Sequence, residues 1–167
     1  MPKTIEKTGA RVWVLAAHEP RPTKEILAIF SGKTVKRMTI SDPYALATPS
    51  NREAQIRFAS DISEIATLRS VVVEYAPDAR NEEEEPFARR DIGARFAASS
   101  AARKGATFMP VRRPQRNRAD DFHDRQVTLE LESPGGVVRS HTLIIGRGLT
   151  ALYEDRWQCS VSYAPPS

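Results

Sequence analysis

His123 and Arg125 are the residues whose types and spacing best suit phosphate chemistry. They stand in Phe122-His123-Asp124-Arg125, where a basic stretch leads into an alternating apolar segment. Alternate side chains of a strand lie on one face, so the imidazole and the guanidinium are expected to point the same way. An imidazole can attack phosphorus or exchange a proton, and a guanidinium can bind two phosphate oxygens at once. We therefore expect a phosphate site where this segment begins.

A glycine-rich turn after the next apolar segment is expected to complete this site. Gly146-Arg147-Gly148 follows Thr142–Ile145 directly. Glycines let backbone N–H groups approach an anion, and Arg147 adds a second guanidinium. The sequence thus predicts that Arg125, Arg147 and the N–H groups of Gly146 and Gly148 hold the phosphate together.

Three further residues are expected to support the site without touching the ligand. Asp42 and Tyr44 belong to Asp42-Pro43-Tyr44, which ends an earlier strand, and Asp124 lies between the histidine and the arginine. Ligands of open α/β sheets lie outside the carboxyl ends of strands, which places Asp42 near such a ligand. The alternative is that the Asp-Pro step simply forms a turn.

The charges of the chain are unevenly distributed. Lys and Arg number 25 against 21 Asp and Glu, a net charge of +4. The stretch 101–118 contains basic residues and no acidic ones, and four of its arginines form a candidate basic rim: Arg112, Arg113, Arg116 and Arg118. Such a run is either a solvated surface or a rim that attracts anions to a phosphate site nearby.

Length and composition favour one soluble domain of 167 residues. We expect a domain over 11–163, with flexible segments at 1–10 and 164–167. The single cysteine, Cys159, excludes an intramolecular disulfide and a four-cysteine zinc site. Apolar runs are too short for a membrane-spanning helix, so the expected location is the cytoplasm. No cofactor and no metal are expected.

The elements that must position these residues alternate along most of the chain. Apolar segments predict strands, and helical periodicity or capping residues predict helices between them. The expected strands are 11–17, 35–40, 70–75, 107–111, 126–131, 142–145 and 157–163; the expected helices are 23–30, one that begins at Ser50 or Asn51, 82–104 and 149–155. This order predicts an α/β fold whose mixed, mostly parallel sheet has helices on both faces.

Three of these motifs resemble a known family. Asp42-Pro43-Tyr44, His123-Asp124-Arg125 and Ile145-Gly146-Arg147-Gly148-Leu149 look like the phospholipase D-like domain at the C-terminus of MIT-domain proteins. The resemblance runs from about Val35 to Tyr163. It implies a phospholipase D-like fold and, in the eukaryotic members, binding of acidic phospholipids beside the membrane-scission machinery. The helical MIT domain has no counterpart in this sequence, which begins with a further β–α unit instead.

The wider phospholipase D superfamily uses the motif His-x-Lys-x4-Asp twice. One His attacks phosphorus, the other protonates the leaving group, and Lys holds the phosphate. By this resemblance His123 takes the place of the His, Arg125 replaces the Lys, and Glu130 stands where the Asp would be. Neither His18 nor His141 has Lys or Arg two residues on, so the sequence holds one copy of the motif.

These observations favour binding over catalysis. We expect an interaction or targeting module that binds phosphate-bearing ligands, either an acidic phospholipid headgroup or a nucleic-acid backbone, in the cytoplasm or peripherally at a membrane. One alternative is a metal-independent phosphodiesterase or nuclease of a bacterial defence system, active as a homodimer in which each chain gives one His123, with Glu130 orienting the ring. A third is a scaffold for protein partners in a larger complex.

Overall fold

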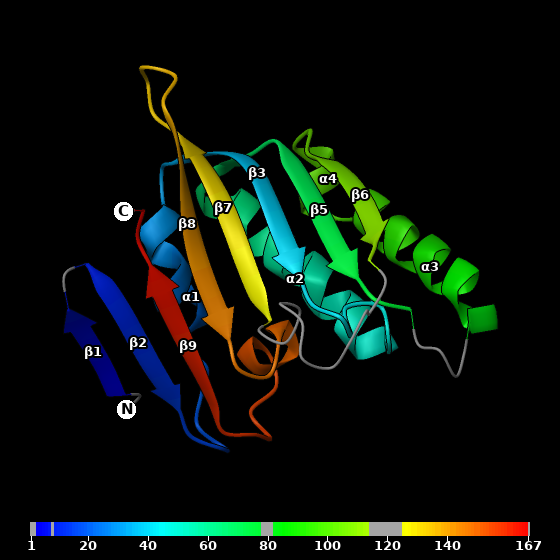
Figure 1. The fold of residues 1–167 in the computed structure, drawn as a ribbon, viewed down its shortest axis with the longest axis horizontal. Helices are drawn as coiled ribbons and strands as arrows, with labels where there is room; N and C mark the ends of the chain where they lie inside the picture. Colours follow the sequence, from blue (N-terminus) through cyan, green and yellow to red (C-terminus); the bar gives the residue numbers. More distant parts are fainter. Residues whose placement is uncertain (1–2, 8, 78–81, 114–124, 167) are drawn as a thin grey trace.

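A computed structural model describes residues 3–7, 9–77, 82–113 and 125–166, and every structural statement below concerns these residues. Their strands form one sheet with the order β1-β2-β9-β8-β7-β3-β5-β6, and the short β4 pairs with β3 (Figure 1). The strands are β1 Lys3–Lys7, β2 Ala10–Leu15, β3 Thr34–Ser41, β4 Thr67–Leu68, β5 Ser70–Tyr75, β6 Thr107–Arg112, β7 Gln126–Glu132, β8 Val138–Ile145 and β9 Cys159–Ala164.

The helical segments are short except for two. They are α1 Thr23–Leu27, η1 Ala28–Phe30, α2 Pro49–Ile65, η2 Glu82–Glu84, α3 Glu85–Ala97, α4 Ser100–Arg103 and η3 Leu149–Leu152, where η marks a 3-10 turn. The expected helix 82–104 is interrupted because Ser99 caps a new helix, accepting a hydrogen bond from the N–H of Ala102. Residues 3–7, which the sequence analysis assigns no strand, form the edge strand β1 beside β2.

The sheet is mostly antiparallel, so the expectation of a mostly parallel sheet is wrong. Only β3 with β4, β3 with β5, and β5 with β6 run parallel in the described residues. The helices α2, α3 and α4 lie between these strands in the sequence, as right-handed crossovers require. The hairpin β7–β8 and the strand β9 then enter antiparallel between β3 and β2. Local sequence patterns do not reveal such an insertion.

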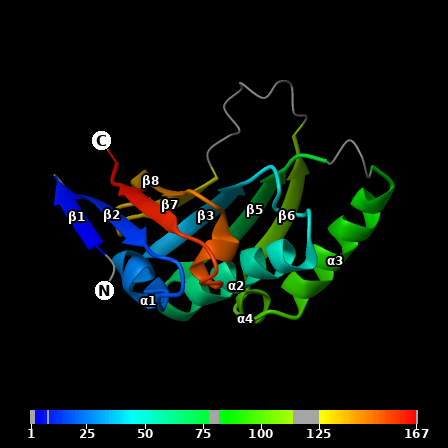
Figure 2. The same cartoon turned by 90° about the horizontal axis from the view of Figure 1, so that it is seen from below.

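The helices cover one face of the sheet, so the expectation of helices on both faces is also wrong. Figure 2 shows α1, α2, α3 and α4 on the same side of the strands. Burial follows this arrangement: Val71 and Val73 of β5 are buried toward the helices, while Val72 and Glu74, which alternate with them along the strand, are partly exposed. Antiparallel sheets tolerate one solvated face, because polar side chains alternate with apolar ones along each strand.

The core lies between this covered face and the helices. Its largest fully buried side chains include Trp13 of β2, Phe30 of η1, Phe58 and Ile62 of α2, and Leu129 of β7. Helix α2 begins after Thr48, whose side chain accepts the N–H of Asn51 at 3.1 Å, and it runs under the middle of the sheet (Figure 2). The packed strands and helix give a rigid frame to the loops at the strand ends.

Candidate anion-binding site

Three strand ends meet at one edge of the sheet. Ser41, the last residue of β3, pairs with Gln126, the first residue of β7, and Gln126 pairs with Ile144 near the end of β8. The antiparallel register therefore places Asp42, Arg125 and Gly146, which extend these strands, beside one another. The carbonyl of Arg125 accepts the N–H of Ile145 at 2.8 Å, which continues the ladder to the edge.

The loop after β3 holds the side chain of Arg125. Its Nε lies 3.6 Å from Oδ1 of Asp42, and its guanidinium carbon lies 4.9 Å from the centre of the Tyr44 ring. Oδ1 of Asp42 also accepts the N–H of Tyr44 at 2.8 Å, which fixes the carboxylate and the ring relative to each other. A carboxylate beside the guanidinium and a ring against it restrict Arg125 to few orientations.

Asp42 has an ionisable side chain that is almost completely buried. Its side chain is 7% exposed. Burial raises the pKa of this carboxyl above its ordinary value, and the Tyr44 N–H and the Arg125 charge act in the opposite direction. Asp42 is thus a buried carboxylate beside the Arg125 guanidinium.

Gly148 lets the turn after β8 approach this pair. Its φ is +78°, and a Cβ built on it would lie 2.8 Å from Oδ2 of Asp42 and 3.0 Å from Cδ of Arg125. A side chain would therefore meet both groups, and an L-residue would be strained in this backbone conformation. The glycine closes the turn against the Asp42–Arg125 pair.

Arg147 is the second cation of the site. Its guanidinium carbon lies 5.1 Å from the centre of the Trp157 ring, and its Nε donates to the carbonyl of Gln158 at 3.0 Å. No carboxylate of the described residues lies within ion-pair distance of Arg147. The terminal N–H groups of Arg147 therefore lie against an aromatic ring, and no acid in the described part of the chain neutralises them.

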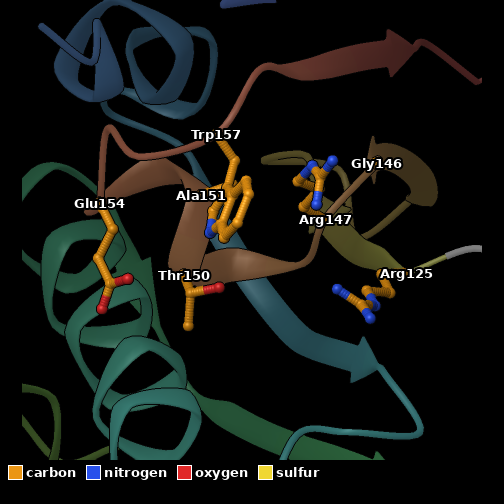
Figure 3. Close-up of a pocket in the computed structure, with 7 residues that line it drawn as sticks. All are labelled: Arg125, Gly146, Arg147, Thr150, Ala151, Glu154 and Trp157. Carbon is orange, nitrogen blue, oxygen red and sulfur yellow. The ribbon is translucent and has the colours of Figure 1, made fainter. Parts of the chain in front are cut away.

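Both arginines line one pocket of about 510 Å³. Figure 3 shows Arg147 between Trp157 and Arg125, with Thr150 and Glu154 on η3 and just beyond it. This volume lies in the range of small-ligand sites. The pocket is lined by Arg125, Gly146, Arg147, Thr150, Ala151, Glu154 and Trp157.

The two glycine N–H groups expected to bind the anion are already used within the chain. The N–H of Gly146 donates to Ser160 at 3.0 Å, and that of Gly148 donates to Ile145 at 3.1 Å. The expectation that these amides bind phosphate is therefore wrong. Gly146 continues the β8–β9 pairing and Gly148 closes a turn, so the guanidinium groups of Arg125 and Arg147 are the predicted donors that remain.

Other predicted site residues lie elsewhere or outside the described residues. Glu130 lies 3.7 Å from Arg37 within the sheet and roughly 16 Å along β7 from Arg125, at ~3.3 Å per residue. Arg112 lies 3.4 Å from Glu85, and Arg113 lies 3.1 Å from Glu74, so neither lines the pocket. The remaining predicted residues lie outside the described ranges: His123, Asp124, Arg116 and Arg118.

The sequence analysis does not predict four residues of the pocket, of which Ala151 is apolar and the other three carry polar or aromatic side chains. Trp157 was expected only as part of a strand, and Thr150 and Glu154 only as part of a short helix. Trp157 lies ten residues after Arg147 on the far side of η3, so no local spacing relates them. An isolated tryptophan in the polar stretch 154–158 is the available indication that a surface aromatic serves a site.

Two features are absent from the part of the chain that the structure describes. No three His, Cys, Asp or Glu side chains in these ranges lie close enough to hold a metal ion. No described helix is both long and apolar enough to cross a bilayer. No protein-family model matches the chain, and no curated protein sequence matches it.

Proposed function

We propose that this chain is a phosphate-binding module of the phospholipase D-like kind, which binds its ligand in the pocket between Arg125 and Arg147. The observation that carries the proposal is that two guanidinium groups line one pocket, each against an exposed aromatic ring. Guanidinium groups bind phosphate oxygens in pairs of hydrogen bonds, and a ring that orients them lowers the entropy lost on binding.

The charges around the pocket support an anionic ligand. Asp42 faces Arg125 from a buried position behind it, and Arg147 has no described acidic partner. The net positive charge of the chain also attracts anions, and it does so over longer distances. Three motifs at the strand ends add the resemblance to the phospholipase D-like domain of MIT-domain proteins, and with it acidic phospholipid headgroups as one ligand class. Nucleic-acid backbones are the second class, because they offer the same phosphate groups to arginines.

Charge reversal tests the site directly. Arg125→Glu and Arg147→Glu are each expected to weaken binding by about 1.5–3 kcal/mol, the range for a charge-assisted hydrogen bond. Arg103→Glu, on α4 far from the pocket, changes the net charge equally and serves as the control. Binding is measured by sedimentation with anionic vesicles and by gel shift with DNA and RNA, at two salt concentrations.

Two results would contradict the proposal. One is unchanged binding in both folded pocket variants, which would place the site elsewhere. The other is equal weakening by Arg103→Glu, which would mean that net charge alone attracts the ligand.

The catalytic alternative depends on His123. A single copy of the motif supplies one histidine per chain, so we expect no release of p-nitrophenol from bis-p-nitrophenyl phosphate in EDTA. Turnover in EDTA that disappears in His123→Ala would favour the dimeric phosphodiesterase over the binding module.

A further inference from the structure

Two aromatic rings beside the pocket's arginines are half exposed, although other large aromatic side chains of the fold are buried in its core. Trp157 lines the pocket, and Tyr44 lies next to it against Arg125. Tyr44 is 50% exposed and Trp157 is 53% exposed, whereas Trp13, the other tryptophan, is 1% exposed. Each ring packs an arginine of the pocket against part of its surface. Large aromatic surface that stays in water beside a charged pocket is typical of a binding site.

We propose that this pocket binds single-stranded nucleic acid, with a phosphate held by Arg125 and Arg147 and bases stacked on Trp157 and Tyr44. The proposal rests on the phosphate site proposed above and names its ligand class. Bases stack on aromatic rings and on guanidinium planes, and both kinds of surface occur together here. A strand that crosses the pocket meets Tyr44 beside Arg125 and Trp157 beside Arg147.

The end of the pocket opposite the arginines favours a nucleotide over an acidic membrane surface. Glu154 lines this end, and Figure 3 shows the Trp157 ring between Glu154 and Arg147. A carboxylate accepts hydrogen bonds from the ring N–H and amino groups of bases or from sugar hydroxyls. The same carboxylate repels a second phosphate, and therefore a dense layer of anionic headgroups.

The ring positions also favour a single strand over a duplex. In a duplex each base is covered by its neighbours, so a protein ring reaches its face only after unstacking it. A single strand offers its base faces without that cost, and a pocket of about 510 Å³ has room for a nucleotide unit.

A comparison of two oligomers separates base stacking from phosphate binding. One is oligothymidylate, and the other is an abasic deoxyribose-phosphate oligomer of the same length. We expect the oligothymidylate to bind at least about 5-fold more tightly, because stacking contributes a ratio of about 5- to 150-fold for each base. Intrinsic fluorescence gives the second readout, because Trp157 is exposed and Trp13 is buried. Oligothymidylate is expected to quench it, and the abasic oligomer and pyrophosphate are not.

Substitutions assign the effect to the two rings. Trp157→Ala and Tyr44→Ala are expected to reduce oligothymidylate binding about 5- to 150-fold while abasic binding changes much less. Trp157→Phe and Tyr44→Phe keep a ring and are expected to retain most of the preference. Phe87→Ala removes a ring that is 59% exposed on α3, outside the pocket lining, and is the matched control.

The outcomes distinguish this inference from the proposed function. Equal binding of the two oligomers without quenching overturns the stacking inference and leaves the phosphate site standing. Binding of anionic vesicles with no binding of oligothymidylate also overturns it, in favour of a membrane surface. Failure of pyrophosphate, both oligomers and vesicles to bind overturns the inference and the phosphate site together.

Discussion

Gly148 is the residue whose replacement most directly tests how the site is assembled. Its left-handed backbone and its contact with Asp42 and Arg125 are separate reasons for a glycine. Gly136, in the turn between β7 and β8, has a similar φ of +81° and open space where a Cβ would lie. The two glycines therefore share the backbone requirement and differ only in the close approach.

Gly148→Ala is expected to destabilise the fold more than Gly136→Ala. The left-handed conformation alone costs an L-residue about 1–2 kcal/mol, and at Gly148 the methyl group must also displace Asp42 or Arg125. Phosphate binding should weaken in Gly148→Ala and stay unchanged in Gly136→Ala. Urea unfolding and a binding titration measure both effects. If the two variants lose the same stability and bind phosphate equally well, the close approach of Gly148 to Asp42 and Arg125 is not needed.

The burial of Asp42 predicts how the stability of the fold depends on pH. Burial is the largest cause that raises the pKa of Asp42, so the folded protein binds its proton more tightly than the unfolded chain does. The stabilisation from protonated Asp42 is therefore complete below the ordinary value of 3.8 and is lost as the pH rises through the raised folded-state pKa.

Asp42→Asn is expected to remove this part of the pH dependence. The amide oxygen can still accept the Tyr44 N–H, while the buried charge is gone. The free energy of unfolding in urea, measured at a series of pH values upward from 3.8, should fall less with pH in the variant than in the native protein. If the free energy of unfolding changes with pH by the same amount in both proteins, burial does not control the ionisation of Asp42.

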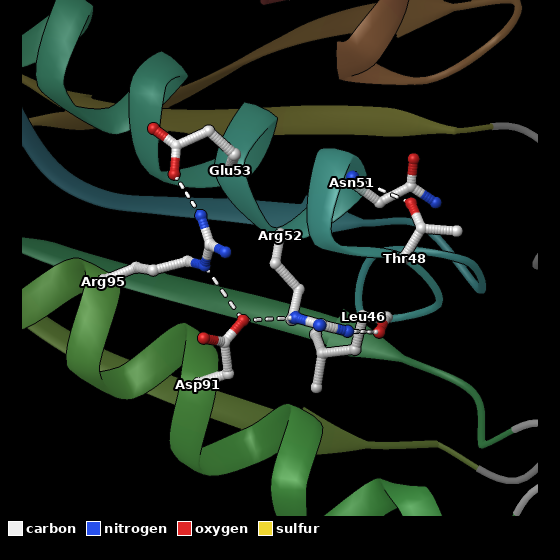
Figure 4. A network of polar contacts seen from close by, with 7 residues as sticks. All are labelled: Leu46, Thr48, Asn51, Arg52, Glu53, Asp91 and Arg95. Carbon is white, nitrogen blue, oxygen red and sulfur yellow. Dashed lines mark hydrogen bonds and ion pairs between the residues drawn. The ribbon is translucent and has the colours of Figure 1, made fainter.

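At the scale of elements, a polar network connects α2, α3 and the loop that carries Tyr44. Arg52 is 7% exposed; its Nε donates to Asp91 at 2.6 Å and its Nη1 to the carbonyl of Leu46 at 2.7 Å (Figure 4). Asp91 also accepts from Arg95, which donates to Glu53 as well. The hydrogen bond from Arg52 is the largest cause that lowers the pKa of Asp91.

Arg52→Ala is expected to cost about 1.5–3 kcal/mol of unfolding free energy, the range for hydrogen bonds to charged groups. It leaves the Leu46 carbonyl without this donor and removes the cation that packs the two helices together. Arg95→Ala removes a side chain that is 32% exposed, so it should cost less than about 1 kcal/mol. Thermal or urea unfolding of both variants measures the difference. A larger loss of unfolding free energy in Arg95→Ala than in Arg52→Ala would mean that the more exposed ion pairs of Arg95 stabilise the fold more than the buried Arg52 does.

At the scale of the whole molecule, the pocket belongs to no single element. Arg125 stands at the start of β7, Arg147 and Glu154 flank η3, and Trp157 precedes β9. The pairing of β3, β7, β8 and β9 places these residues side by side, and the helices pack against one face of these strands. The other basic side chains of the described rim, Arg112 and Arg113, are paired with acids at the β6 edge.

Local patterns were sufficient for most of the longer elements and for part of the site, but not for β1, β4 or the division of the helix predicted over 82–104. Strand β5 is found over the predicted residues, because an apolar run rich in β-branched side chains forms a strand wherever it packs. The proximity of Asp42, Arg125 and Arg147 could also be predicted, because all three follow or precede strands that reach one sheet edge. These conclusions need only periodicity and strand direction.

Only the tertiary structure determined which N–H groups and side chains at the strand ends are available to a ligand. The N–H groups of Gly146 and Gly148 are used by Ser160 and Ile145, a pairing that follows from β9 entering beside β8. The same placement brings Trp157 against Arg147 across a turn of ten residues. Strand order and side-chain packing over such separations depend on long-range contacts throughout the sheet, and residue spacing within one segment does not specify them.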